Sequence, residues 1–246
     1  MSTKSRIKHL LVTGSLCTLI LAACEKTPSA APVSSLVYGP QTPLHAPIER
    51  PALGGATFGP NGPPVPATAR TQRAFLRRTW SFYFGLDENV SIGFAQVHQE
   101  SRWNCAAVSS HGAMGCAQFM PATAVWIAPL LPKDIRDACA ESKGCPFDPK
   151  WALTAMSKFD RALWQDDAFA ATEDDRWRFV LSSYNGGGGW VRRERAEAKK
   201  QGLDDTRWAS LANVCLRSVA SCRENRGYPA VILDKYRPLY RAWLGG

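Results

Sequence analysis

The sequence predicts a mainly α-helical domain that follows a long segment without regular structure. Apolar residues recur at helical spacing from about residue 70 onward, and no segment alternates apolar and polar residues over more than a few positions. Ten of the 17 prolines lie between residues 25 and 69, where apolar content is too low to offset the entropy cost of ordering. We therefore expect a disordered linker over 24–69 and one globular domain over 70–246.

The first residues have the features of an export signal. Basic residues precede an apolar run from Leu10 to Ala23, which ends in small residues before Cys24. The run is shorter than the roughly 20 residues that a membrane-spanning helix needs. Small residues directly before a cysteine resemble the lipobox of bacterial lipoproteins, in which that cysteine is acylated. The sequence thus predicts a lipoprotein signal peptide over 1–23 and a lipid on Cys24, against the alternative of an ordinary signal peptide with a chance cysteine.

This resemblance implies a periplasmic, lipid-anchored protein. Lipoproteins that carry Asp after the acylated cysteine are retained in the inner membrane, and this chain has Glu25 there. The expected anchor is therefore the inner leaflet of the outer membrane, in a bacterium with two membranes. The linker would act as a tether that lets the domain reach the wall, and the alternative is an arm wrapped on the domain surface.

The charge of the chain is basic. It has 30 Lys and Arg against 21 Asp and Glu, a net charge of +9, which falls to +6 when Lys4, Arg6 and Lys8 leave with the signal. A basic surface attracts anionic wall polymers and lipid head groups. No nucleic-acid-binding module is recognisable, so no nucleic-acid partner is predicted. The basic stretch 192–200 is more typical of a solvated helix face than of a binding patch.

Two helices are predicted at the start of the domain. The apolar stripe of the first consists of Phe75, Leu76, Trp80 and Tyr83. Asn89 is expected to cap the second, which runs through Ile92 and His98 and has Glu100 in its last turn.

Three further helices follow in the second half of the chain. Asp148 before Pro149 predicts an N-cap and a first turn. The buried face of that helix is expected to be Ala152, Ala155, Met156, Phe159 and Leu163. Thr172 and Asp175 resemble a weak capping box before a helix that the glycines at 186–189 must end. A last helix is predicted from about Pro229 to Tyr240.

Cysteine usage fits an exported protein. Cys17 would leave with the signal and Cys24 would take the lipid, and an oxidising compartment favours bridges among the other six. They fall as three sequence-local pairs, which we expect to be the disulfides Cys105–Cys116, Cys139–Cys145 and Cys215–Cys222. A metal site is the alternative, but no Cys-x-x-Cys occurs and only four histidines are present, so we expect no metal.

Glu100 is the candidate catalytic residue on chemical grounds. A carboxyl group can donate a proton near neutral pH only if its pKa is raised, usually by an apolar and partly dry setting. Phe94, Val97 and Trp103 are its apolar neighbours in sequence, and a helix that ends before a glycine-bearing loop is a reasonable floor for a cleft. The alternative is a solvent-facing glutamate, although a negative charge near a helix C-terminus is mildly unfavourable.

Three motifs occur in order over roughly residues 90–240. The first is Glu100-Ser101, then Ser109-x-x-Gly-Ala-x-Gly, then Gln118-x-Met120-Pro121. The second is Tyr184-Asn185-Gly, and the third is Glu224-x-x-x-Tyr228 before Val231-Ile232-Leu233. In order and spacing they resemble the SLT family of lytic transglycosylases, which cut bacterial peptidoglycan. The chain departs from the family at Gly115-Cys116-Ala117-Gln118, where Gly-Leu-Met-Gln is usual, and at Pro229, where Val is common.

The resemblance implies a lysozyme-like α-helical fold with a catalytic cleft, and a helix that opens at Pro121. It implies Glu100 as the catalytic acid. The residues that it assigns to substrate binding are Ser101, Ser109, Gln118, Met120, Tyr184 and Asn185. Tyr184 and Ser109 would orient the acid and the N-acetyl group of the substrate.

The activity implied is cleavage of the MurNAc–GlcNAc bond with formation of 1,6-anhydro-MurNAc ends, by Glu100 as a single general acid and base. Most glycosidases need a second carboxylate, and the nearest later acids, Asp134 and Asp137, lie outside every motif. No cofactor is expected, and partners are peptidoglycan glycan strands and, as the family allows, other cell-wall or secretion-machine proteins. The alternatives are a goose-type lysozyme-like hydrolase and an inactive wall-binding scaffold lipoprotein.

Overall fold

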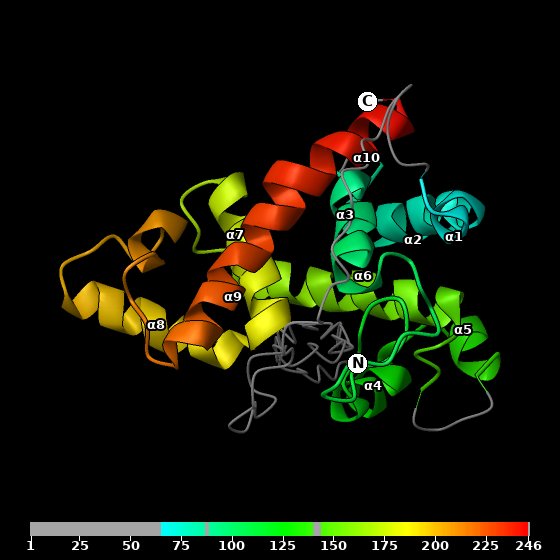
Figure 1. Ribbon diagram of the computed structural model, residues 1–246, viewed down its shortest axis with the longest axis horizontal. Coiled ribbons are helices and arrows are strands. Elements are labelled where there is room, and N and C mark those ends of the chain that lie inside the picture. Colours follow the sequence, from blue (N-terminus) through cyan, green and yellow to red (C-terminus); the bar gives the residue numbers. More distant parts are fainter. Residues whose placement is uncertain (1–64, 87–88, 140–143, 246) are drawn as a thin grey trace, which may run out of the picture. The chain divides into compact units, whose positions relative to one another are not determined.

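The computed structural model describes residues 65–86, 89–139 and 144–245, which fall within one compact unit and are mainly helical (Figure 1). The predicted mainly α-helical class is confirmed. Within the described ranges, β-structure is limited to two isolated bridges, which pair Met114 with Val108 and with Phe119. The predicted signal peptide, Cys24 and all but the end of the linker lie outside the described residues.

The helices are joined by connections of different lengths, with long ones over 102–120 and 201–218. In chain order they are α1 (Ala67–Thr71), α2 (Arg73–Phe84), α3 (Val90–Ser101), α4 (Pro121–Ile127), α5 (Lys133–Asp137), α6 (Pro149–Asp166), α7 (Glu173–Gly186), α8 (Gly188–Lys200), α9 (Val219–Ala230) and α10 (Arg237–Leu244). Two 3₁₀ turns, η2 (Ala128–Leu130) and η3 (Trp208–Leu211), and a π-helical segment, η4 (Val231–Tyr236), complete them. In the described part of the chain, no helix is both long and apolar enough to span a bilayer.

Two of the three predicted helix caps are confirmed. Asp148 accepts a hydrogen bond from the backbone N–H of Trp151 at 2.7 Å, and Thr172 accepts one from that of Asp175 at 3.1 Å. Asn89 precedes α3 as expected but makes no side-chain cap. Its side chain is used between helices instead, because it donates to Glu173 and accepts from Arg237.

One predicted helix boundary is confirmed and another is wrong. The glycine run ends α7 at Gly186 as predicted, and a single residue with positive φ, Gly187, separates it from α8, which begins at Gly188. The last helical region begins at Val219, and Pro229 lies inside α9 rather than at a helix start. A proline within a helix forgoes one backbone hydrogen bond, and here the chain stays helical through η4 into α10.

Helix α3 is the centre of the fold. It packs against α2, η4 and α10, and nine of its twelve residues are buried (Figure 1). A helix buried on most of its surface must be surrounded by other elements. Gly93 permits the close approach of α2, because a Cβ atom there would lie 2.6 Å from the ring of Trp80. The end of α3 is therefore held from several sides.

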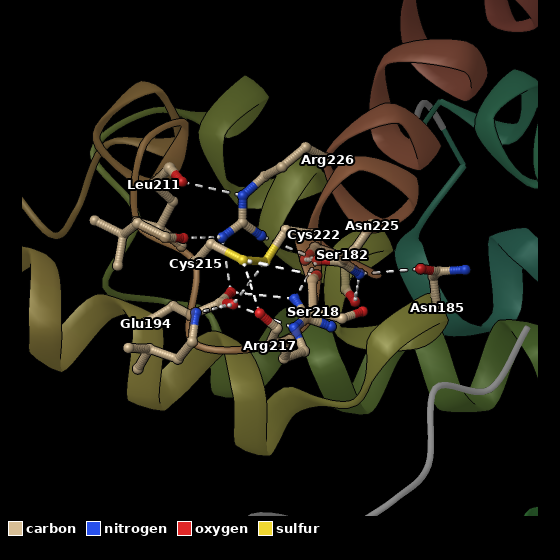
Figure 2. A network of polar contacts seen from close by, with 12 residues as sticks. Ser182, Asn185, Glu194, Leu211, Cys215, Arg217, Ser218, Cys222, Asn225 and Arg226 are labelled. Atoms are coloured by element: carbon tan, nitrogen blue, oxygen red, sulfur yellow. Dashed lines mark hydrogen bonds and ion pairs between the residues drawn. A yellow bond between two sulfur atoms is a disulfide. The ribbon is translucent and has the colours of Figure 1, made fainter. Parts of the chain in front are cut away.

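A buried ionic network joins α7, α8 and α9 (Figure 2). Glu194 of α8 has no exposed surface, and its carboxylate accepts hydrogen bonds from Arg217 at 3.1 Å and Arg226 at 2.7 Å. Asn225 connects this pair to α7, because its amide donates to the carbonyl of Ser182 and to the side chain of Asn185. The network therefore fixes α9 against the helix that carries the Tyr-Asn-Gly motif.

All three predicted disulfides are present. Cys105–Cys116 closes the loop after α3, and Cys139–Cys145 joins the segments on either side of residues 140–143. Cys215–Cys222 joins the loop that carries Arg217 to the first turns of α9, beside the ionic network (Figure 2).

Replacing Glu194 with Ala should lower the free energy of unfolding by about 3–5 kcal/mol, because two largely buried guanidinium groups lose their counter-charge. Urea denaturation measures this loss. The matched control is Glu197→Ala on the same helix, whose partner Lys200 is exposed; its loss should stay below about 0.5 kcal/mol. Equal losses in the two variants would contradict the assigned role of Glu194.

Candidate active site

Glu100 lies in the last turn of α3 and is only 3% exposed, on the wall of a cavity that is open to solvent. The lining residues come from the end of α3, the following loop and η4. They are His98, Gln99, Glu100, Ser101, Arg102, Asn104, Ala107, Val108, Gln118 and Tyr236. Among these described residues Glu100 is the one carboxylate, so it is the group at this cavity that can donate and recover a proton as a carboxylic acid.

Tyr228 holds the carboxyl group of Glu100. It lies in α9, is buried, and donates its hydroxyl to Oε1 of Glu100. Burial, and secondarily the charge of Glu100, raises the pKa of Tyr228 well above its usual range. The phenol therefore keeps its proton at physiological pH and acts as a permanent hydrogen-bond donor to the acid.

Tyr184 has a related but different position. Its buried hydroxyl donates to the backbone carbonyl of Ala117 at 2.8 Å. Burial first, then Glu100 and Asp160, raises the pKa of Tyr184 well above its usual range, so this phenol is also neutral. Tyr184 thus fixes the loop opposite Glu100, whereas the phenol that bonds the acid itself is Tyr228.

The chain turns sharply after α3 through two left-handed residues. Arg102 and Trp103 have φ of 54° and 66°, although neither is glycine. Such a pair costs conformational energy and persists only where the surroundings impose it. The indole of Trp103 is buried against Phe94, with ring centroids 5.3 Å apart. This packing holds the turn that ends α3 after Ser101, one residue beyond Glu100.

Several bonds fold the loop after α3 back onto that helix. Ser101 donates its hydroxyl to the carbonyl of Cys116 at 2.8 Å, and the disulfide Cys105–Cys116 closes the same loop covalently. Ser109 accepts a hydrogen bond from the backbone N–H of Ala113 at 2.9 Å. The loop is therefore rigidly attached at both ends.

Gly115 allows this loop to approach a second one. Its φ is +77°, and a Cβ atom would lie 1.7 Å from the carbonyl oxygen of Pro146. Gly112 has a similar φ of +81° but open space around it. At Gly115 the close neighbour is the protein's own backbone.

Three of the seven predicted site residues line the cavity: Glu100, Ser101 and Gln118. Gln118 is held by hydrogen bonds from its amide to the carbonyls of Gly115 and Ala107.

The structure places the other four elsewhere, within the described part of the chain. Tyr184 and Ser109 brace the loop, and Met120 immediately precedes α4. Asn185 is buried and accepts a hydrogen bond from Asn225 at 3.0 Å (Figure 2). Its amide therefore stabilises the contact between α7 and α9.

Sequence reasoning missed His98, Arg102 and Tyr236 on the cavity wall. His98 precedes Glu100 by two residues, contacts the Tyr240 hydroxyl at 2.8 Å and packs against the ring of Tyr236. Burial, then Arg102 and Lys235, lowers the pKa of His98 to about 4, so the imidazole is neutral at pH 7. A neutral histidine beside the acid adds no positive charge that would favour its ionised form.

Tyr228 was also missed, although it is the tyrosine of the Glu224-x-x-x-Tyr228 motif. The signal was present in the sequence, but nothing in the spacing shows that α9 returns to the end of α3. Among the described residues, no group of three or more His, Cys, Asp or Glu side chains is arranged to hold a metal ion.

The segment around this cavity matches a known protein family. The transglycosylase SLT domain matches residues 87–206. The chain therefore contains a transglycosylase SLT domain over these residues. The match includes Glu100, the loop and Tyr184, whereas Tyr228 and Tyr236 lie beyond its C-terminal end. From outside the matched segment, η4 therefore contributes Tyr236 to the cavity wall and α9 contributes the Tyr228 hydroxyl that bonds Glu100.

Solved structures of similar fold include the 70-kDa soluble lytic transglycosylase of Escherichia coli, with a TM-score of 0.51 and 24% identity over 68% of this chain. A structure of the 70-kDa soluble lytic transglycosylase in complex with bulgecin A matches with a TM-score of 0.52 and 22% identity over 73% of this chain. The match spans only 24% and 26% of those longer chains. The likeness confirms the predicted lysozyme-like α-helical fold.

Proposed function

We propose that this SLT protein is a peptidoglycan lytic transglycosylase that cleaves the MurNAc–GlcNAc bond and leaves 1,6-anhydro-MurNAc ends. The observation that carries the proposal is Glu100, a buried carboxyl group on the wall of an open cavity, bonded by Tyr228 and contained in the segment that matches the family. The proteins of similar fold are themselves described as soluble lytic transglycosylases.

In the first step Glu100 is the general acid. Its carboxyl proton passes to the oxygen between MurNAc C1 and GlcNAc C4, and the C1–O bond breaks as GlcNAc leaves with that proton. The carbonyl oxygen of the substrate's own N-acetyl group stabilises the cationic C1, as in other substrate-assisted glycosidases. Glu100 is left as a carboxylate.

In the second step the same residue is the general base. The Glu100 carboxylate takes the proton of the MurNAc C6 hydroxyl, and O6 forms a bond to C1. This closes the 1,6-anhydro ring, consumes no water and returns Glu100 to its protonated form. The lining supports this route, because Glu100 is the one carboxylate among the described cavity residues, whereas hydrolysing glycosidases commonly use a second one.

Tyr228 orients the acid through both steps. Its hydroxyl donates to Oε1 and leaves Oε2 for proton transfer. Because the phenol stays protonated, the bond exists in both ionisation states of Glu100 and strengthens when the carboxylate forms.

Replacing Glu100 with Gln should abolish release of soluble fragments from purified peptidoglycan, since the amide cannot supply a proton. Mass spectrometry of the wild-type digest should find 1,6-anhydro-MurNAc ends. The matched control, Glu197→Gln on α8, should retain full activity.

Other outcomes would assign a different function. Reducing ends in place of anhydro ends would identify a goose-type lysozyme-like hydrolase. Binding of wall material without soluble products would identify an inactive scaffold. An active Glu100→Gln variant would exclude the assigned acid altogether.

Replacing Tyr228 with Phe should lower kcat about 10- to 100-fold, the value of one hydrogen bond to a charged group, with a smaller change in KM. Kinetics of product release measures the effect, with circular dichroism to check the fold. Tyr83→Phe, a half-buried tyrosine of α2, serves as the control and should be neutral. If Tyr228→Phe were as active as the wild type, the bond to Glu100 would have no catalytic value.

We also propose that the protein is anchored by lipid on Cys24 in the outer membrane, with the domain in the periplasm and glycan strands as its partner. The apolar run before Cys24 and the oxidising compartment implied by three disulfides support this placement.

Metabolic labelling with an alkyne fatty acid tests the anchor. The wild type should be labelled and fractionate with outer membranes, whereas Cys24→Ala should lose the label. Cys17→Ala is the matched control, because that residue lies inside the predicted signal and should leave labelling unchanged. Labelling that survives in Cys24→Ala would contradict the anchor.

A further inference from the structure

A second buried carboxyl group, that of Asp160, bonds a side chain that lies one helical turn from the catalytic glutamate. Gln96 precedes Glu100 by four residues on α3, so the two side chains share a face of the helix. The amide of Gln96 donates to Oδ1 of Asp160, on α6, at 3.2 Å, and neither residue has exposed surface. The mechanism above makes no use of this pair.

Two oxygen atoms of the pair lack partners. Oδ2 of Asp160 and Oε1 of Gln96 are both buried without a hydrogen bond. Burying two hydrogen-bond acceptors without a donor between them costs free energy, because neither oxygen can bond to water. A proton on Oδ2 supplies the missing donor, because a carboxylic acid and a primary amide can then exchange two hydrogen bonds in one planar pair.

The surroundings do not favour a charged Asp160. Within the described ranges, no Lys, Arg or His forms an ion pair with it, and an unpaired buried carboxylate is costly. Burial raises the pKa of Asp160 to about 8, opposed only by the bond from Gln96, and no charged group on α2, α5 or α7 is among the causes. Its charge would act on Tyr184 of α7 and Tyr228 of α9, the two phenols that also feel Glu100 of α3.

We propose that Asp160 is a positioning residue, held as a neutral carboxylic acid that pairs with Gln96 and thereby fixes the last turn of α3 and Glu100. The arrangement depends on the proton of the Asp160 carboxyl group. When Asp160 ionises, its donated bond to Gln96 is lost, two oxygens repel each other, and an uncompensated negative charge lies beneath the site.

The consequence for activity rests on the proposed function and follows from the number of protons that the active enzyme must carry. If Glu100 must be protonated to act as the acid and Asp160 must be protonated to position it, only the doubly protonated enzyme is active. Above both pKa values, kcat/KM then falls about 100-fold per pH unit, against about 10-fold for a single acid. In Asp160→Asn two amides form the pair, which stays neutral at every pH. The decrease of kcat/KM in this variant should therefore be only about 10-fold per pH unit.

The control is Asp167, a second buried aspartate at the end of α6. Its pKa is raised to about 7 by burial and the charge of Asp166, against the arginines Arg195, Arg176 and Arg192. Asp167→Asn therefore removes a similar titration among cations and away from the Gln96 pair. It should leave the 100-fold slope unchanged.

The unfolding equilibrium gives a readout that needs no activity. The folded pKa of Asp160 is above its unfolded value, so the unfolded chain binds fewer protons and the wild type loses stability as pH rises from about 4 to 8. The folding equilibrium constant of Asp160→Asn, divided by that of the wild type, should therefore rise about tenfold per pH unit over that window and stay constant above it.

The deciding experiment combines infrared spectroscopy with the pH profile of the full domain. At pH 7 the wild type should show a carboxylic acid band that Asp160→Asn loses and Asp167→Asn keeps. Gln96→Leu should keep the band and lose activity, which separates the acid from its positioning effect. If Asp160→Asn does not fold, titration of the wild-type band, expected to vanish near pH 8, replaces it.

Absence of an Asp160-dependent band at pH 7, or equal slopes in the wild type and Asp160→Asn, would overturn the proposal. A wild type that releases no product at any pH would instead overturn the proposed function. The infrared and unfolding measurements then still decide whether the neutral pair exists.

Discussion

The hydrogen bond from Tyr228 to Glu100 holds the candidate acid in place. It joins residues 128 positions apart, one at the end of the central helix α3 and the other in α9. A buried carboxyl group at a helix C-terminus is unfavourable by itself, because both desolvation and the helix dipole oppose its charge. The phenol makes burial tolerable while keeping the acid close to an open cavity.

The remainder of the domain can be understood as support for that bond. Glu194 and its two arginines fix α9 against α7 and α8, and Asn225 extends the network to Asn185 (Figure 2). On the other side of the acid, Trp103 and the Cys105–Cys116 disulfide hold the turn and loop that follow α3. Glu100 is thus restrained from two independent directions, as proton transfer at a defined atom requires.

Periodicity predicted the helical class, cap chemistry the starts of α6 and α7, and the local pairing of the cysteines the three disulfides, because each depends on residues close in sequence. Motif order singled out Glu100 as the candidate acid. The role of Tyr228 was not predictable in this way, because it depends on how α9 packs across α3. The same limit applies to Asn185, whose motif suggested substrate contact but whose amide bonds Asn225. The π-helical η4 is not predictable from the sequence, because Pro229 favours a helix start, whereas the chain stays helical through it.

The placement of Tyr228 also explains why the site extends beyond the segment that matches the SLT domain. Residues 87–206 contain the acid, but the donor to it and the Tyr236 wall come from the following 40 or so residues. Those residues pack onto the domain through a buried charge network and a disulfide. Removing one partner of a buried ion pair is strongly destabilising, because the other charge is left uncompensated. The cavity around Glu100 is therefore complete only when η4 is in place, and the hydrogen bond to the Glu100 carboxyl group requires α9 to be in place as well.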